Sequence, residues 1–256
     1  MSVLSDSNHW FVCPRVNSEA EIRLFLFPYA GGGPAVFNQW ISKLPGEIEA
    51  WVAHYPGRGS RHREAPIRRL TMLAEKFCQA ILPLSEKPFA FFGHSLGGLV
   101  AFELARQLQQ EKSLRPEILF VSASGAPHLA GSHPPTHGYS DSEFMTSLRE
   151  WNGIPSELTH QPDVMQLLLP ILRADFEAVE SYTYHSNVSP LHVPIAAFGG
   201  SEDSHVSQER IEGWALHTDA GFQSQYFAGD HFFIKSCGEV IAALIAAKLI
   251  SSYEKN

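Results

Sequence analysis

The sequence predicts an α/β fold, in which a mostly parallel, twisted sheet is flanked by helices. Short, continuous apolar runs recur along the chain and end at Gly or Pro, which is typical of strands buried on both faces of a sheet. Helical patterns of apolar residues lie between these runs, and βαβ units produce this alternation. A Gly-x-Ser-x-Gly motif also lies between one such run and a helical pattern, which is the setting of a strand–turn–helix junction.

The strands are predicted from the apolar runs. The strongest candidates are Ile22 to Phe27, Phe89 to Phe92, Ile118 to Ser122 and Ile195 to Phe198. Weaker candidates are Glu49 to His54 and Gln223 to Phe227. We expect all of them to belong to one central sheet.

The helices that alternate with these strands are predicted from apolar residues three or four positions apart. They cover Ala35 to Leu44, Leu70 to Leu82, Leu96 to Leu108 and Val240 to Ile250. In a doubly wound sheet such helices cover both faces.

The stretch from Gly125 to Val193 interrupts this alternation, because it holds helical patterns and no clear strand. One helix is expected over Asp141 to Trp151, with its first residue or Ser140 as the N-cap. A second is expected over Asp163 to Tyr182, where Pro170 should kink or break it. Helices inserted at this point can cap the carboxyl edge of the sheet, where such folds place their sites.

The length of 256 residues fits one large α/β domain or two small ones. The order of the patterns favours a single domain. Its core is expected to span about 20–125 and 193–250, and an inserted helical lid about 126–192.

Composition and charge exclude several classes of protein. With 44% hydrophobic and 18% charged residues, the chain is not of the disordered class. The net charge of −8 disfavours nucleic acid as a partner. No apolar run is long enough to span a bilayer, and the first residues lack the pattern of a secretory signal. The three cysteines contain no C-x-x-C pair, so we expect a reducing, cytoplasmic location.

The strongest chemical signal is Gly93-His94-Ser95-Leu96-Gly97. A sharp turn between a strand and a helix would expose the Ser95 hydroxyl, and the flanking glycines permit the close packing that such a turn needs. The motif therefore predicts Ser95 as a nucleophile.

A serine nucleophile needs a base, and in the α/β-hydrolase order that base is a late histidine. His231 is the last of the 13 histidines and lies between a strand candidate and the final helix. His205 and His217 are the other late candidates, but His217 falls in a helical stretch and is expected on the surface.

The acid that orients the histidine should follow the strand candidate that ends at Phe198. Asp203 is favoured there over its neighbour Glu202. Asp230 is next to His231 in sequence, and adjacent residues rarely reach the required geometry.

An oxyanion needs two preorganised donors. One is the backbone N–H of Leu96, directly after the nucleophile. The other should come from the glycine-rich loop Pro28 to Gly33. The alternative, a phosphate-binding loop, lacks the lysine of the P-loop motif.

Five motifs in order resemble one family. They are FPYAGGG, YPGRGSR, FFGHSLGG, LPILRADFEAVESY and GDHFF. Together they look like the type II thioesterases, the stand-alone editing hydrolases of non-ribosomal peptide and polyketide synthesis. They are also similar to the medium-chain acyl thioesterase that acts with animal fatty acid synthase. The resemblance runs from about Arg23 to Ile250.

The resemblance implies an α/β-hydrolase fold with a helical lid. It implies a Ser95, Asp203 and His231 triad, with the N–H groups of Ala30 and Leu96 as the oxyanion hole. The expected reaction is hydrolysis of acyl groups bound as thioesters to phosphopantetheine on acyl or peptidyl carrier proteins. This mechanism needs no metal or organic cofactor. The alternatives on the same fold are a carboxylesterase or lipase, acyl transfer between carriers, and a catalytically silent binding module.

The segment Arg58 to Arg69 holds five arginines and one glutamate, a positive island in an acidic chain. We expect Arg63, Arg68 and Arg69 to guide docking of acidic carrier proteins. The alternative is a solvated loop with ion pairs, in which Arg58 and Arg61 brace the loop under the site.

The predicted lid region has two further features. His128, His133 and His137 are loosely spaced and have no carboxylate or cysteine cluster beside them, so we expect no metal site. Apolar residues such as Phe144, Leu148, Trp151, Leu167, Leu168, Ile171, Leu172 and Phe176 either pack on the core or line an acyl channel.

Overall fold

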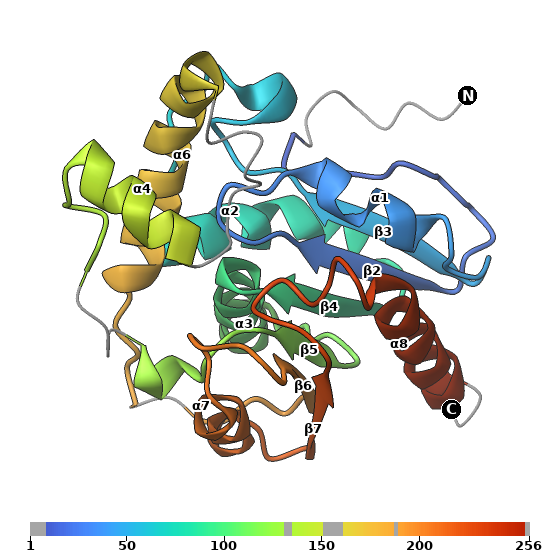
Figure 1. The fold of residues 1–256 in the computed structure, drawn as a ribbon. Helices are drawn as coiled ribbons and strands as arrows, with labels where there is room; N and C mark the ends of the chain where they lie inside the picture. Colours follow the sequence, from blue (N-terminus) through green and yellow to red (C-terminus); the bar gives the residue numbers. More distant parts are fainter. Residues whose placement is uncertain (1–8, 131–134, 151–160, 187–188, 254–256) are drawn as a thin grey trace.

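The structure of the protein is a computed structural model, and the residues it describes are 9–130, 135–150, 161–186 and 189–253. At its centre lies a seven-stranded sheet with the strand order β1-β3-β2-β4-β5-β6-β7 (Figure 1). The strands are β1 (Phe11–Val12), β2 (Ile22–Phe27), β3 (Ile48–Ala53), β4 (Phe89–His94), β5 (Leu119–Ser122), β6 (Ile195–Gly200) and β7 (Phe222–Phe227). Only β1 pairs antiparallel, so the predicted mostly parallel sheet is confirmed.

The interior strands are apolar on both faces because helices cover both faces. All six residues of β4 are buried, whereas the four middle residues of the edge strand β7 are exposed. All the strand candidates are present, the two weaker ones as β3 and β7. β1 was not predicted from the sequence, since a two-residue strand carries no periodic pattern.

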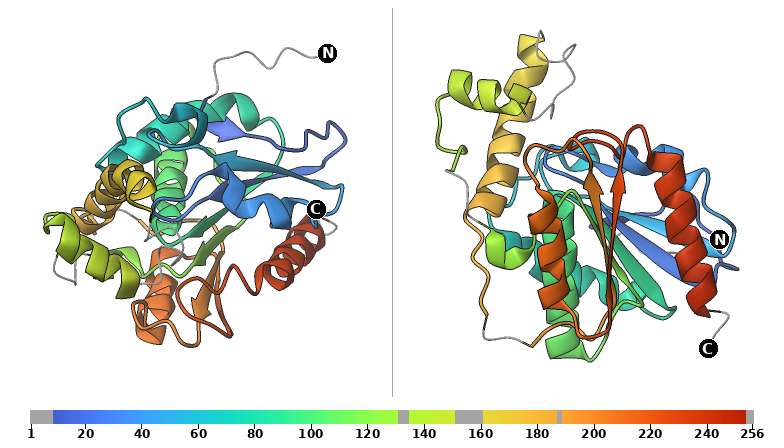
Figure 2. Two further views of the ribbon diagram at one scale, coloured as in Figure 1. Left: turned by 45° about the horizontal axis from the view of Figure 1, so that its top comes forward. Right: turned by 60° about the horizontal axis from the view of Figure 1, so that its bottom comes forward.

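Two apolar layers enclose the sheet. On one face, α2 (Leu70–Ile81) and α3 (Leu96–Gln107) pack on Phe25, Phe27 and Phe91. On the other face, the short α1 (Asn38–Ile41) and the C-terminal α8 (Gly238–Tyr253) pack on Leu24, Leu26 and Phe92. Figure 2 (right) shows α3 and α8 on opposite sides of the sheet.

The helix expected over Ala35 to Leu44 is shorter than predicted. A 3₁₀ turn over Pro34–Phe37 precedes the four-residue α1. Pro45 disfavours the helical conformation at Leu44, the last residue of the predicted helix. A short helix, α7 (Gln208–Glu212), follows β6 and was not predicted. Within the described residues, no helix has the length and apolar character needed to cross a bilayer.

The stretch between β5 and β6 holds α4 (Asp141–Glu150) and α6 (Pro162–Glu180), which lie together beside the sheet (Figure 1). Apolar side chains join the two helices in a small cluster of their own, formed by Phe144, Leu148, Met165 and Leu172. Ser140 caps α4 with Glu143: the Ser140 N–H and hydroxyl donate to the Glu143 carboxylate at 3.0 and 2.6 Å. Trp151 and His133 lie outside the described residues.

The break expected at Pro170 does not occur. α6 continues from Pro162 to Glu180 through this proline. An interior proline costs a helix about 3 kcal/mol, because it removes a backbone hydrogen bond and crowds the preceding turn. Met165 and Leu172, on either side of Pro170, are buried in the same apolar cluster, and this packing keeps both halves in one helix.

Candidate active site

Ser95 lies at the junction of β4 and α3 in a backbone conformation that non-glycine residues rarely adopt, with φ of 54° and ψ of −117°. Two glycines make this turn possible. A Cβ on Gly97 would lie 2.0 Å from the Phe27 carbonyl oxygen, and one on Gly93 would lie 2.1 Å from the Gly97 carbonyl oxygen. The Ser95 N–H donates to the Ser122 carbonyl at 2.8 Å, which anchors the turn to β5.

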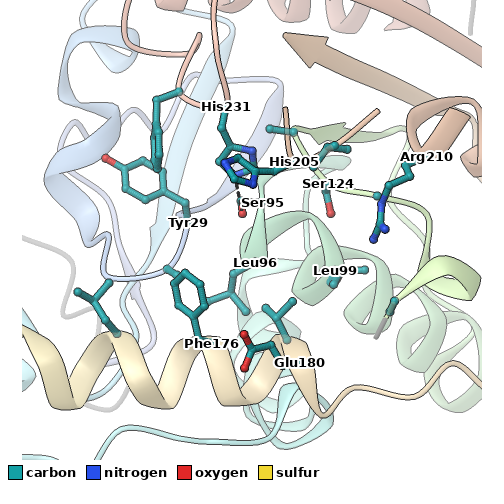
Figure 3. Close-up of a pocket in the computed structure, with 18 of the residues that line it drawn as sticks. Tyr29, Ser95, Leu96, Leu99, Ser124, Phe176, Glu180, His205, Arg210 and His231 are labelled. Carbon is teal, nitrogen blue, oxygen red and sulfur yellow. Dashed lines mark hydrogen bonds between the residues drawn. The ribbon is translucent and has the colours of Figure 1, made fainter. Parts of the chain in front are cut away.

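The loops after β6 and β7 bring Asp203 and His231 to this serine. His231 Nε2 lies 3.0 Å from Ser95 Oγ (Figure 3), and His231 Nδ1 lies 2.8 Å from Asp203 Oδ2. An ionised carboxylate only accepts hydrogen bonds, so Nδ1 carries the proton and Nε2 is left to accept the one from Ser95. The imidazole is buried, with 3% of His231 exposed.

The environment of Asp203 keeps this carboxylate ionised. Its Oδ1 accepts the backbone N–H groups of His205 at 2.9 Å and Val206 at 3.0 Å. Burial raises the pKa of Asp203, but the hydrogen bond and charge of His231 and these two N–H donors outweigh it and lower the pKa overall. The structure thus brings Asp203 to His231, while Glu202 is exposed.

The other candidate groups have different partners. Asp230 Oδ1 accepts the Phe232 N–H at 2.8 Å. His217 was expected on the surface, and this was wrong: only 3% of it is exposed. It packs on Trp214 and lies 2.7 Å, ring nitrogen to ring nitrogen, from His128. Burial, with His128 and Arg106 nearby, lowers the pKa of His217 to about 4.

His94 is a site residue that sequence reasoning missed. It is fully buried, and its Nε2 lies 2.9 Å from the His231 carbonyl oxygen, to which it must donate. Its Nδ1 then accepts the Ser122 hydroxyl at 2.9 Å. Burial, followed by the charge of His231, holds the pKa of His94 well below its ordinary value. A neutral His94 therefore anchors the backbone of His231. The sequence did contain a signal for this role, because His94 is a polar residue at the end of an otherwise apolar strand.

The glycine-rich loop after β2 lies beside the nucleophile. The Gly32 N–H donates to the Tyr29 carbonyl at 2.9 Å, and Gly31 has φ of +77°. Ala30 and Leu96, the expected oxyanion donors, line the same pocket as Ser95. Figure 3 shows Leu96 beside Ser95. The loop thus contributes Tyr29 and Ala30 to the pocket lining, and the oxyanion hole stays a prediction.

The pocket above Ser95 has mostly apolar walls. Leu148 of α4 and Leu172, Phe176 and Val179 of α6 form one side of it. Phe144 packs instead within the apolar cluster that joins α4 and α6, and Leu167 is 74% exposed. Some apolar residues of α4 and α6 therefore pack against each other, and others line the pocket.

Charged groups at the pocket wall already have protein partners. The Glu180 carboxylate accepts from the Thr136 hydroxyl and the His137 ring, both at 2.6 Å. Arg210 Nη2 donates to the Leu129 carbonyl at 3.1 Å. Within the part of the chain that the structure describes, no group of three or more metal-ligating side chains occurs.

The arginine segment divides into buried and exposed members. Arg58 and Arg61 are each 7% exposed. Arg58 forms a bidentate ion pair with Asp175 of α6, at 2.7 and 2.8 Å. Arg61 donates to the His54 carbonyl at 2.6 Å and binds Glu64.

The three arginines expected to dock a carrier are exposed. Arg68 pairs with Glu177 of α6 at 2.6 Å, so this carboxylate offsets part of the positive charge of Arg68. Arg63 and Arg69 belong to the same exposed segment.

Comparisons with known proteins agree with this geometry. The model of the thioesterase domain family matches residues 22–249. Linear gramicidin dehydrogenase LgrE of Brevibacillus parabrevis is 39% identical over 247 residues, which cover 95% of this chain and 94% of LgrE. The gramicidin S biosynthesis protein GrsT of Aneurinibacillus migulanus is 42% identical, over 91% of each chain.

A solved structure shares the fold. The type II thioesterase BorB from the borrelidin biosynthetic cluster superimposes with a TM-score of 0.86 at 31% identity, over 93% of this chain and 96% of BorB. The fold class predicted from the sequence, an α/β-hydrolase sheet flanked by helices, is that of this relative. The family match, the sequence relatives and the shared fold each span most of the chain, and the chain belongs to the thioesterase domain family.

Proposed function

We propose that this enzyme hydrolyses acyl thioesters on phosphopantetheinyl carrier domains of a non-ribosomal peptide or polyketide synthase, and so removes aberrant or stalled acyl groups. The observation that carries the proposal is the hydrogen-bonded series Ser95, His231 and Asp203 at the floor of an apolar pocket. Membership of the thioesterase family supports the thioester bond as the target. The names of GrsT and BorB, which refer to gramicidin S and borrelidin biosynthesis, support a synthase as partner.

The proposed reaction begins with attack of the Ser95 hydroxyl on the thioester carbonyl. His231 Nε2 accepts the serine proton, and Asp203 stabilises the imidazolium that forms. The N–H groups of Ala30 and Leu96 receive the developing oxyanion. When the tetrahedral intermediate collapses, the C–S bond breaks, His231 returns the proton to the thiolate, and an acyl group remains on Ser95.

Deacylation repeats these steps with water. His231 removes a proton from water, which attacks the acyl-serine carbonyl, and the carboxylic acid leaves as Ser95 regains its proton. The apolar pocket wall formed by Leu172 and Phe176 accommodates the acyl chain. Transfer to a second thiol would use the same groups, with that thiol in the place of water. A cytoplasmic location stays a prediction.

Substrate comparison tests the reaction type. The proposal predicts faster hydrolysis of an acyl group on a phosphopantetheinyl carrier protein than of the matched oxygen ester or the free acyl-CoA, measured as kcat/KM. Ser95→Ala should lower kcat by at least about 10⁴-fold while the thermal unfolding curve stays unchanged, because the nucleophile is lost and the fold is not. A preference for the oxygen ester, or an active Ser95→Ala variant, would contradict the proposal.

The role of the acid is tested by Asp203→Asn. An asparagine amide can donate to Nδ1 and so favours the tautomer protonated on Nε2, which cannot accept the Ser95 proton. We expect kcat to fall by about 10⁴-fold with little change in KM. The exposed neighbour is the matched control, and Glu202→Gln should retain nearly full activity. An Asp203→Asn variant with more than a tenth of the normal kcat would show that another group orients His231.

The exposed arginines are part of the same proposal, as a docking surface for an acidic carrier protein. Arg63 and Arg69 are exposed, and Arg68 of the same segment pairs with Glu177 of α6, a helix that forms part of the pocket wall. Opposite charges across a rim interface mainly accelerate association and weaken with salt.

Charge reversal tests the docking surface. Arg63→Glu combined with Arg69→Glu should lower kcat/KM on carrier-bound substrate on the order of tenfold at low salt. The same variant should leave hydrolysis of a small acyl-N-acetylcysteamine thioester unchanged. Arg115→Glu, an exposed arginine just before β5 and so at the opposite edge of the sheet, is the control. Equal rates for both variants on the carrier substrate would reject docking at these arginines.

A further inference from the structure

We propose that Asp175 of α6 is a positioning residue for the oxyanion hole, so that an inserted helix holds the catalytic loop in its active conformation. This inference rests on the proposed function, because it assumes that Ala30 supplies an oxyanion donor. Asp175 belongs to α6, whereas Ser95, Asp203 and His231 lie outside this helix. Asp175 touches no reacting atom and acts through the loop alone.

The contacts of Asp175 join the inserted helix to the loop directly. Its Oδ2 accepts the Gly31 N–H at 2.7 Å. The same oxygen accepts Arg58 Nη1 at 2.7 Å, and Oδ1 accepts Arg58 Nη2 at 2.8 Å. Only 1% of Asp175 and 7% of Arg58 are exposed, so this pair is shielded from water. The carboxylate is therefore fully committed to one guanidinium and one backbone N–H.

Arg58 extends the same support to the next peptide of the loop. Its Nη1 also donates to the Gly32 carbonyl at 3.1 Å. Its guanidinium lies over the Tyr55 ring, 5.0 Å from the centroid, and the Tyr55 hydroxyl donates to the Pro28 carbonyl at 3.2 Å. The loop is thus held at backbone groups on both sides of Ala30.

The bond to Gly31 stabilises the type of turn that the loop adopts. Tyr29 to Gly32 form a turn closed by the Gly32 N–H on the Tyr29 carbonyl. Gly31, the third residue, has a positive φ, while Ala30, the second, is absent from the positive-φ residues, which identifies a type II turn. The Gly31 N–H belongs to the middle peptide of this turn. Rotation of that peptide converts type II into type I and turns the N–H away.

The Ala30 N–H belongs to the preceding peptide, so Asp175 acts on it indirectly, by holding the peptide on the other side of the Ala30 Cα. By accepting the Gly31 N–H, Asp175 stabilises the type II turn of a loop whose Ala30 lines the pocket beside Ser95. α6 also packs closely on the turn, since a Cβ on Gly31 would lie 2.7 Å from Leu172 Cδ2. Moving α6 away would leave Arg58 buried without its counter-charge, which is strongly unfavourable. We infer that α6 stays in place during turnover.

The test uses Asp175→Asn with a small acyl-N-acetylcysteamine thioester, so that carrier docking does not enter. Asparagine keeps the shape of the side chain but loses the charge that binds Arg58 and Gly31. We expect kcat to fall about 10²- to 10³-fold with KM within about threefold, the loss seen when one oxyanion donor is removed. The affinity for an acyl trifluoromethyl ketone, which forms a tetrahedral adduct with a serine nucleophile, should fall by the same factor. The affinity for the product acid should not change.

Two further variants make the result decisive. Glu177→Gln removes the exposed ion pair with Arg68 on the same helix and should leave kcat unchanged. Asp175→Glu keeps a negative charge beside Arg58 but displaces the acceptor from Gly31, and should lower kcat at least about tenfold even where Asp175→Asn fails to fold. A folded Asp175→Asn or Asp175→Glu variant with normal kcat, or one that loses ketone and product affinity equally, would overturn the inference. Failure of the proposed function is distinct, because it would appear as activity in Ser95→Ala.

Discussion

The active site depends on one steric constraint, the contact between the start of α3 and the end of β2. No side chain fits at Gly97, where a Cβ would meet the Phe27 carbonyl oxygen at 2.0 Å. This contact forces the sharp turn that gives Ser95 its positive φ. Phe27 directly precedes the Pro28–Gly33 loop, so the same contact sets the distance between the nucleophile and the expected oxyanion donors. Nucleophile and loop are therefore positioned together.

The pocket combines this rigid floor with a wall taken from the inserted helices. Leu172 and Phe176 supply apolar surface, while Asp175 on the same helix is turned away to Arg58 and Gly31. Charged groups that do reach the wall are bound by the protein, as Glu180 is by Thr136 and His137. Since buried polar groups without partners are costly, these pairings let an apolar acyl chain enter without meeting an unpaired charge.

Most of the fold, and the three residues that the structure joins by hydrogen bonds at Ser95, could be predicted because they depend on local patterns: apolar runs, a Gly-x-Ser-x-Gly junction and the order of the chain. The predictions that were wrong concern features that depend on tertiary packing. Pro170 does not break α6 because apolar contacts on both sides maintain the helix, and His217 is buried despite its helical pattern. The contact of Asp175 with Gly31 spans 144 residues, and that of His94 with His231 spans 137. No local periodicity encodes such pairs.

The central claim is that the turn at Ser95 presents this hydroxyl, and no other group, to the thioester carbonyl. The most direct measurement is rapid quenching of the reaction with an acyl-carrier substrate, followed by digestion and mass spectrometry. The account predicts that the acyl mass appears on the peptide that contains Ser95, and that it forms and decays at least as fast as turnover. An acyl group on another residue, or no acyl-enzyme at any time in a reaction whose deacylation is slow, would contradict it.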